Sequence, residues 1–539
     1  MIVYRILSVL LFYVGLAHGA VWQWSVPVGE SRAWLWIPQN CKRVRAVLFA
    51  QHNMIERKIM EHPEMRRTLA ECGIAEVFVF PSKDPVFDFK KGAGEWFEET
   101  MRALADESGH AELAKVPAAP MGHSAHASFP WNFAAWNPGR TLAVLSVKGD
   151  APLTGLTGSG RPNPDWGGRS LDGVPGLMVM GEYEWWEKRL EPLVAFKNAR
   201  PDVPLALFAD VGHGHFDAQD ELVRYLALFL RKAAAARLTD DGSNELRAVD
   251  PSKGWRVDRW RKDEAPRAAA APFASYEGEK AEAFWCFDEE MARVTEARYE
   301  TSRGKKEQQV GFFRDGKPVP ISNTHFGTAL EFRPEEDGLS FRLEVGFIAP
   351  LPPDPPTATK DERPPVVSKQ PEPAPEDSHA AGEVTVSKIV GPVEELGGGR
   401  FRLSPDWMFP AAGDEPFEAW FLASNPGDKI YKSAVRQALL TIPRNTEGSA
   451  QTITFPEFAD PEPGVRTIEL TATSDSGLPV SYYVKQGPAF VKGSTLHQTP
   501  LPPGAKRPVK VVVVAWQFGR ASEPKVRQAE PVEREFRIR

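Results

Sequence analysis

The sequence of 539 residues has few cysteines, no long apolar run after its first residues and no excess of positive charge. Three cysteines are too few for a scaffold stabilised by disulfides. No run of eighteen apolar residues follows the N-terminal segment, so we expect no membrane-spanning helix in the rest of the chain. The 65 Lys and Arg are outnumbered by 72 Asp and Glu, whereas nucleic-acid-binding proteins normally carry a basic excess. This charge balance predicts no nucleic-acid partner. No Walker A or dinucleotide motif follows a strand pattern, so we expect no cofactor.

Residues 1–19 are typical of a secretory signal peptide. Arg5 precedes an apolar run, and small residues follow it up to Ala20. A retained anchor helix is the alternative. The pattern predicts export, to a secreted or periplasmic location, with attachment at the cell surface left open. In such an oxidising compartment Cys41 and Cys72, each placed just before a predicted strand, either form a bridge or stay as two thiols.

Residues 20–238 alternate between apolar strand patterns and amphipathic helix patterns. Such alternation predicts an α/β domain whose mainly parallel sheet of eight strands is covered by helices on both faces. Asp217 is the expected N-cap of the last helix. The predicted strands are 22–28, 32–38, 45–50, 76–80, 118–123, 141–148, 176–181 and 204–209, and the predicted helices are 56–72, 94–108, 183–198 and 218–236.

The remaining residues have a different texture. Residues 239–450 are predicted to be β-rich, with one helix at 281–298, paired strands at 328–333 and 339–347, and a proline-rich linker or loop at 350–376. Residues 451–539 carry turn signals between short strands, which predicts an independent β-sandwich. The stretch TIELTATSDSGLPVSYYVKQGPAFVKGSTL resembles bacterial immunoglobulin-like repeats, which are usually spacers or adhesion elements.

The segment Met121–His126, MGHSAH, is the candidate for chemistry because it joins a strand to a helix. A serine at such a turn has its hydroxyl held above the sheet, and the next amide can stabilise an oxyanion. On this motif residues 20–238 resemble the α/β-hydrolase superfamily, whose turn is G-x-S-x-G. Here His126 replaces the final glycine.

The resemblance implies a nucleophile, an acid and a histidine in that chain order. Ser124 follows the fifth strand, and Glu184 follows the seventh in the expected G-x-x-acid pattern, with Glu182 as the alternative. His213 fits the Gly-His position after the last strand, with His215 as the alternative. The histidine would take the serine proton and the acid would orient the imidazole.

Three further assignments complete the predicted site. The oxyanion hole would combine the amide of Ala125 with that of Asn53 or Met54. Aromatic faces near the elbow and the acid make Trp131, Trp185 and Trp186 candidates for substrate binding. A metal site at His213, His215 and Asp217 is a competing hypothesis, but no further ligand motif accompanies it.

These features predict an exported serine hydrolase of carboxylic esters, acting through an acyl-enzyme on acetyl- or feruloyl-type esters of polysaccharide. The substrate class rests on analogy with exported enzymes that carry accessory β modules. The alternatives are a serine peptidase of the prolyl-oligopeptidase type, and a non-catalytic surface or adhesion protein with a hydrolase-like scaffold. The sequence does not indicate the oligomeric state.

Overall fold

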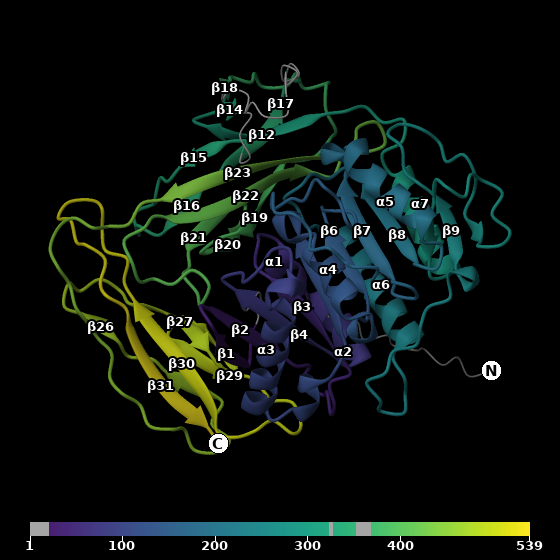
Figure 1. Ribbon diagram of the computed structural model, residues 1–539. Coiled ribbons are helices and arrows are strands. Elements are labelled where there is room, and N and C mark those ends of the chain that lie inside the picture. The colour runs from purple at the N-terminus through teal and green to yellow at the C-terminus, as the bar shows by residue number, and fades with distance from the viewer. Residues whose placement is uncertain (1–20, 323–326, 352–367) are drawn as a thin grey trace, which may run out of the picture.

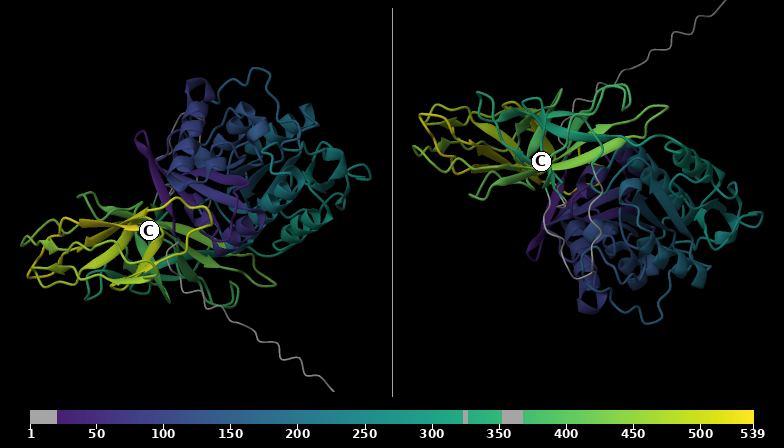
Figure 2. Two further views of the ribbon diagram at one scale, coloured as in Figure 1. Left: turned by 90° about the horizontal axis from the view of Figure 1, so that it is seen from below. Right: turned by 90° about the horizontal axis from the view of Figure 1, so that it is seen from above.

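The computed structural model describes residues 21–322, 327–351 and 368–539 (Figure 1). The predicted signal peptide, and residues 352–367 of the proline-rich segment, lie outside the described residues. Both views of Figure 2 show the C-terminal strands, in yellow, extending to one side of the sheet and helices built from the first half of the chain. No helix within the described ranges combines the length and apolarity needed to cross a membrane.

Eight strands form one sheet in the order β1-β2-β4-β3-β5-β6-β7-β8. β1 and β2 form an antiparallel hairpin, β2 also pairs antiparallel with β4, and every later pair is parallel. This confirms the predicted mainly parallel sheet of the α/β-hydrolase fold. The strands are β1 Trp24–Val28, β2 Ser31–Trp36, β3 Ala46–Gln51, β4 Ile74–Phe80, β5 Ala118–His123, β6 Val144–Val147, β7 Gly176–Gly181 and β8 Leu205–Asp210.

Helices cover both faces of this sheet because successive strand residues point to opposite sides. Leu48 and Phe78 share a core with α2 and α6, whereas Phe49 and Val77 pack with α3 and α4. The α-helices are α1 Glu56–Met60, α2 Pro63–Cys72, α3 Ala93–Ser108, α4 Phe129–Trp136, α5 Glu187–Ala199 and α6 Asp220–Arg237. Short 3₁₀ turns are η1 Phe89–Lys91, η2 Ala111–Ala114, η3 Ser124–His126, η4 Pro138–Arg140, η5 Glu182–Glu184 and η6 Pro251–Lys253.

Four helix predictions need correction. The expected helix at 183–198 begins only at Glu187, because the 3₁₀ turn η5 and the non-helical Trp185 and Trp186 precede α5. The expected helix at 56–72 is two helices, because His62 leaves the helical region and its ring accepts a hydrogen bond from the amide of Glu64 at the start of α2. The expected helix at 281–298 is a strand, β11 Ala283–Cys286, followed by α7 Glu289–Glu300, which the side chain of Asp288 caps. Asp217 is not the cap of α6, which begins after Gln219.

Residues 239–300 close the open edge of the sheet beside β8. β9 Trp255–Asp258, β10 Ala271–Pro272 and β11 form a small sheet of their own. From α7 the hydroxyl of Tyr299 donates to the carbonyl of Leu207 at 3.1 Å and lies 3.4 Å from the amide of Ala209. These contacts occupy backbone groups that an edge strand would otherwise expose.

The next part of the chain is built from sheets of two to four strands. Its centre is the long hairpin of β22 and β23, which is extended by β19 and by the parallel strand β15. The segments 328–333 and 339–347 do not pair with each other as predicted, because β15 pairs with β23 and β17 with β12. The strands are β12 Gln309–Arg314, β13 Lys317–Pro318, β14 Ile321–Ser322, β15 Ala329–Glu331, β16 Ser340–Arg342, β17 Glu344–Ile348, β18 Ser368–Lys369, β19 Thr385–Val390, β20 Val393–Gly397, β21 Arg400–Leu403, β22 Phe417–Asn425 and β23 Ala434–Ile442.

The last residues form three further small sheets around a core that includes Val511, Val513 and Phe536. The opposite side of β30 carries Val514 and Trp516, which belong to the core of the preceding β-rich part. The last strands are β24 Ile453–Thr454, β25 Thr467–Glu469, β26 Thr473–Ser474, β27 Ser481–Gln486, β28 Ala489–Lys492, β29 Thr495–Gln498, β30 Val509–Trp516 and β31 Val532–Ile538. The three cysteines Cys41, Cys72 and Cys286 are free thiols, so the structure contains no Cys41–Cys72 bridge.

Candidate active site

Ser124 lies at a sharp turn between β5 and α4, with a backbone φ of 55°. A non-glycine residue adopts this left-handed conformation only where the surrounding structure enforces it, and strain of this kind is typical of a nucleophile elbow. The turn brings the carbonyl of His126 so close to Gly122 that a Cβ there would lie 1.9 Å from it. Gly122 is therefore required for the turn that presents Ser124.

His126, which replaces the usual final glycine of the elbow, is held by a neighbouring loop. Its Nε2 lies 2.5 Å from the hydroxyl of Ser82, and its ring is buried. Burial, followed by the nearby His52 and Arg161, lowers the pKa of His126 to about 3. The ring is thus neutral, and the hydrogen bond to Ser82 explains how an imidazole is accommodated at this position.

Ser124, His215 and Glu184 form one chain of hydrogen bonds. Nε2 of His215 lies 2.7 Å from the Ser124 hydroxyl, and Nδ1 contacts the Glu184 carboxylate. Burial alone would raise the pKa of Glu184, but its hydrogen bond with His215 and the nearby Lys148 outweigh burial, and the pKa is lowered. The ionised carboxylate accepts from Nδ1–H, so the unprotonated Nε2 faces the Ser124 hydroxyl and can accept its proton.

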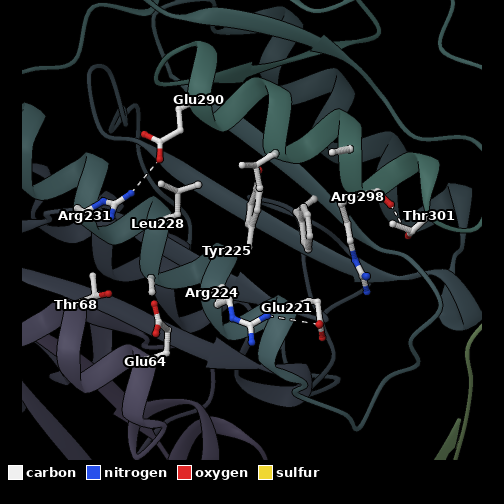
Figure 3. A pocket seen from close by; sticks show the side chains of 14 residues that line it. Glu64, Thr68, Glu221, Arg224, Tyr225, Leu228, Arg231, Glu290, Arg298 and Thr301 are labelled. Atoms are coloured by element: carbon white, nitrogen blue, oxygen red, sulfur yellow. Dashed lines mark hydrogen bonds and ion pairs between the residues drawn. The ribbon is translucent and has the colours of Figure 1, made fainter. Parts of the chain in front are cut away.

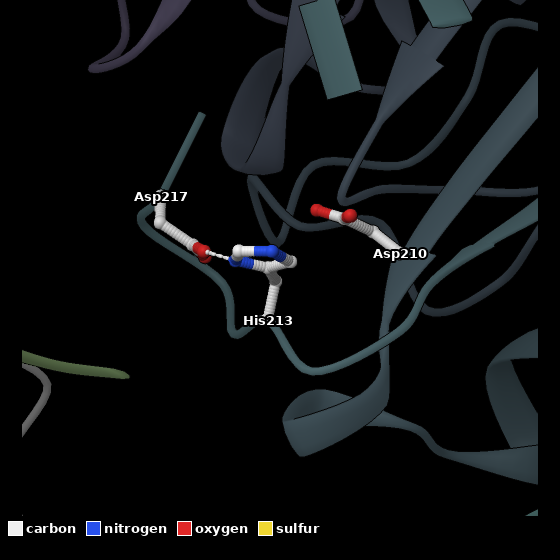
Figure 4. Close-up of side chains that lie close together, drawn as sticks. All are labelled: Asp210, His213 and Asp217. Atoms are coloured by element: carbon white, nitrogen blue, oxygen red, sulfur yellow. Dashed lines mark hydrogen bonds and ion pairs between the residues drawn. The ribbon is translucent and has the colours of Figure 1, made fainter. Parts of the chain in front are cut away.

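His213, the preferred histidine of the sequence analysis, lies in a different cluster. Its Nδ1 is hydrogen-bonded to Asp217, as Figure 4 shows, and its pKa is raised because Asp210 and Asp217 outweigh the opposing effect of burial. The assignment of His213 to the serine is therefore wrong in this structure, and the alternative, His215, fits. The reason is local: β8 ends at Asp210, and the loop that follows reaches Ser124 only two residues after His213.

The same cluster bears on the metal hypothesis. Ligand atoms of Asp210, His213 and Asp217 lie within 4.8 Å of one another. However, Nζ of Lys148 lies 2.5 Å from Asp210 and 3.7 Å from Asp217, and so occupies the position of a positive charge. His215 bonds to Ser124 and Glu184 instead. The donor set is therefore an internally neutralised ion network and does not suit a metal ion.

Glu182, the alternative acid, does not face the histidine. One of its carboxylate oxygens is 2.9 Å from Nζ of Lys432, and the other accepts the amide of Gly212 at 2.8 Å. Glu182 thus connects two loops of the site without contacting its reacting atoms.

The predicted oxyanion donors differ in whether their amides are already hydrogen-bonded to a carboxylate. The amides of Asn53 and Met54 both donate to the carboxylate of Glu56, at 3.1 and 2.8 Å, so neither fits the assigned role. Ala125 directly follows the nucleophile. A Cβ on Gly158 would lie 3.2 Å from the amide nitrogen of Ala125, so the loop after β6 packs directly against the elbow.

Two buried residues that the sequence analysis missed, His123 and Glu56, hold the loops around the site through hydrogen bonds. Nε2 of His123 lies 2.9 Å from the carbonyl of His215, and its Nδ1 lies 3.2 Å from the side-chain amide of Asn53. Glu56 accepts the amide of His123 at 2.9 Å, and burial raises the Glu56 pKa to about 7 despite its backbone hydrogen bonds. The histidine inside the G-H-S motif was a signal for such a role.

The three candidate tryptophans have different environments. Trp131 is 1% exposed and its Nε1 donates to the carbonyl of Asp150 at 2.7 Å, so its predicted role in substrate binding is wrong. Trp185 packs edge-on against Trp260, with ring centroids 4.7 Å apart. Trp186 is 44% exposed and remains available to a ligand.

Two hollows lie away from this cluster. One, of about 480 Å³, lies among α2, α6 and α7, and ion pairs between Arg224 and Glu221 and between Arg231 and Glu290 line it (Figure 3). The other, of about 400 Å³, lies near Lys197 and Arg256. Neither is lined by Ser124, His215 or Glu184.

No protein-family model matches this chain, and no curated protein sequence matches it. Among solved structures, an S-formylglutathione hydrolase from Agrobacterium tumefaciens is 15% identical, covers 39% of this chain and 93% of its own, and has a TM-score of 0.30. The siderophore hydrolase EstA from Aspergillus nidulans is 12% identical, with the same coverages and a TM-score of 0.29. Est1E from Butyrivibrio proteoclasticus is 16% identical, covers 40% of this chain and 100% of its own, and has a TM-score of 0.27. At such scores the fold assignment rests on the strand order given above.

Proposed function

We propose that this protein is a serine hydrolase that cleaves carboxylic esters through an acyl-enzyme. The observation that carries the proposal is the distance of 2.7 Å between Nε2 of His215 and the hydroxyl of Ser124, at an elbow that holds the serine in a left-handed conformation. A non-catalytic scaffold would have no need for this strained serine beside an imidazole that is itself oriented by a carboxylate.

In the proposed reaction the Ser124 oxygen attacks the ester carbonyl while its proton passes to Nε2 of His215. Glu184 stabilises the resulting imidazolium through Nδ1–H. The imidazolium then protonates the departing alcohol, which leaves the acyl group on Ser124. Water, deprotonated by the same imidazole, attacks the acyl-enzyme and releases the acid, and the proton returns to Ser124.

The finer proposal is an exported enzyme that acts on acyl groups of polysaccharide, of the acetyl or feruloyl type. Its support is the exposed Trp186, two residues after Glu184, whose face can stack on a sugar or aromatic ring. Export rests on the sequence pattern of residues 1–19.

The test is turnover of p-nitrophenyl acetate and labelling by a fluorophosphonate. We expect the wild-type chain to show both, and Ser124→Ala to lose the label and to lower kcat by about 10⁴–10⁶-fold with its circular dichroism unchanged. A chelator should leave the rate unchanged. Unchanged turnover in Ser124→Ala would refute the proposal, and cleavage of peptide amides in preference to esters would favour the peptidase alternative.

A further inference from the structure

A lysine far from the candidate nucleophile in the sequence reaches the two loops that carry the histidine and the acid. Lys432 lies in the turn between β22 and β23, and only 2% of it is exposed. Its Nζ lies 2.9 Å from Glu182 and 2.8 Å from Asp263. Burial would lower the pKa of Lys432, but these two carboxylates outweigh burial and raise it, so the side chain is a cation.

Glu182 passes this contact on to the histidine loop. Its second carboxylate oxygen accepts the amide of Gly212 at 2.8 Å, and Gly212 lies three residues before His215. Glu182 itself lies two residues before Glu184, within the same 3₁₀ turn. One carboxylate thus ties the loop of the acid to the loop of the histidine, and Lys432 neutralises it.

The residue after Lys432 adds a second link between the same loops. The hydroxyl of Ser433 donates to the carbonyl of Gly212 at 2.7 Å, and its own carbonyl accepts the hydroxyl of Tyr183. Ser433 and Gly212 are so close that no side chain fits at position 212, because a Cβ on Gly212 would lie 1.9 Å from the Ser433 hydroxyl. Since Tyr183 lies between Glu182 and Glu184, the turn at 432–433 holds both loops through separate hydrogen bonds.

We infer that Lys432 is a positioning residue, which sets the contact between His215 and Glu184 by fixing Glu182. The inference rests on the proposed function, and it assigns to the β-rich part of the chain a role in building the site. Removing the ammonium group would leave the Glu182 carboxylate buried without its cationic partner. Because an uncompensated buried charge is costly, we expect the two loops to move apart.

The test compares full-length Lys432→Met with Lys429→Met, since Lys429 is an exposed lysine of the same turn. With a soluble ester, Lys432→Met should lower kcat by about 10–100-fold, the size expected for misplaced reacting groups, while KM changes less than about threefold. Hydrogen exchange, followed by mass spectrometry, should be faster in peptides spanning residues 181–185 and 210–216. Lys429→Met should match the wild type in both measurements.

The double variant Lys432→Met with Glu182→Gln provides the rescue. The glutamine carbonyl can still accept the Gly212 amide without a buried charge, so both kcat and slow exchange should largely return. Wild-type kcat or wild-type exchange in Lys432→Met would overturn the inference, as would a double variant no better than the single one. An inactive wild type would refute the proposed function instead, and the exchange rates would still decide the role of Lys432.

Discussion

The parallel-sheet part of the chain and the β-rich remainder differ in how their strands find partners. From β5 to β8, each strand of the eight-stranded sheet lies beside the next strand along the chain. Because these strands are parallel, the loops after them gather at one edge of the sheet. In the β-rich part, hairpins such as β22–β23 are joined to strands that are distant in sequence, as in the pairing of Ala329 with Leu439. The first arrangement supplies the reacting groups. The β-rich part contacts the loops that carry these groups through the turn after β22.

The largest predicted effect separates the two histidines of the loop after β8. His215→Ala should lower kcat by about 10⁴–10⁶-fold, as for other residues that act as a unit with the nucleophile, whereas His213→Gln should cost less than about tenfold. The measurement is steady-state turnover of p-nitrophenyl acetate by folded variants. The reverse ranking would restore His213 as the proton acceptor.

The second prediction asks whether the end of the chain serves stability alone. Trp516 on β30 is buried against the β-rich core. Trp516→Ala should lower the free energy of unfolding by about 3–5 kcal/mol, because it opens a cavity in that core. Turnover by the remaining folded protein should be unchanged, and Trp516→Phe should cost less stability. A fall in kcat for folded Trp516→Ala would show that the last module also helps to build the site.

Much of the sheet was predictable because its information is local. The uninterrupted apolar run 46–50 of β3 has residues buried on both faces, and right-handed crossovers then leave few possible strand orders. The prediction for the segment at 281–298 was wrong because Phe284 of β11 and Phe287, which follows the strand, fall at helical spacing relative to Met291. Only the docking of β11 beside β9 favours the strand.

The site was predictable to the level of loops but not of individual side chains. Ser124 and Glu184 lie at positions that the strand ends determine. Which histidine reaches Ser124 depends instead on the contacts of the loop after β8, where Lys148 bonds to Asp210 and His213 to a neighbouring aspartate. No local pattern relates these loops to Lys432. That contact arises only once the β-rich part has folded against the sheet.

The third prediction concerns pH and the ion network that holds His213. Because the pKa of His213 is raised in the folded state, its stabilising contribution is complete below about pH 6.5 and is lost as the pH rises through the folded value. The pKa of Asp217 is lowered, so its contribution is present above about pH 3.8 and is lost as the pH falls through the folded value. The pair therefore stabilises most between these limits.

Thermal unfolding of the wild type and of His213→Gln, measured from pH 4 to pH 9, tests this. The variant should be less stable by about 1.5–3 kcal/mol near pH 5–6, the usual worth of a hydrogen bond to a charged group, and the difference should shrink at alkaline pH. A difference that grows with pH would mean that His213 is neutral in the folded protein.

The smallest predicted effect compares two tryptophans near the site. Trp186 is exposed beside Glu184, and the guanidinium of Arg189 lies 5.9 Å from its ring centroid, so a planar group can pack on its open side. Trp186→Ala should raise KM for a feruloyl-type ester by about 2–10-fold, as expected for an aromatic contact of about 0.5–1.5 kcal/mol, and should leave acetate esters unaffected. Trp131→Phe is the matched control, since it loses a buried hydrogen bond to Asp150 and should lower the melting temperature without changing KM. Equal KM values for the feruloyl-type ester in the wild type and Trp186→Ala would remove Trp186 from the substrate-binding surface.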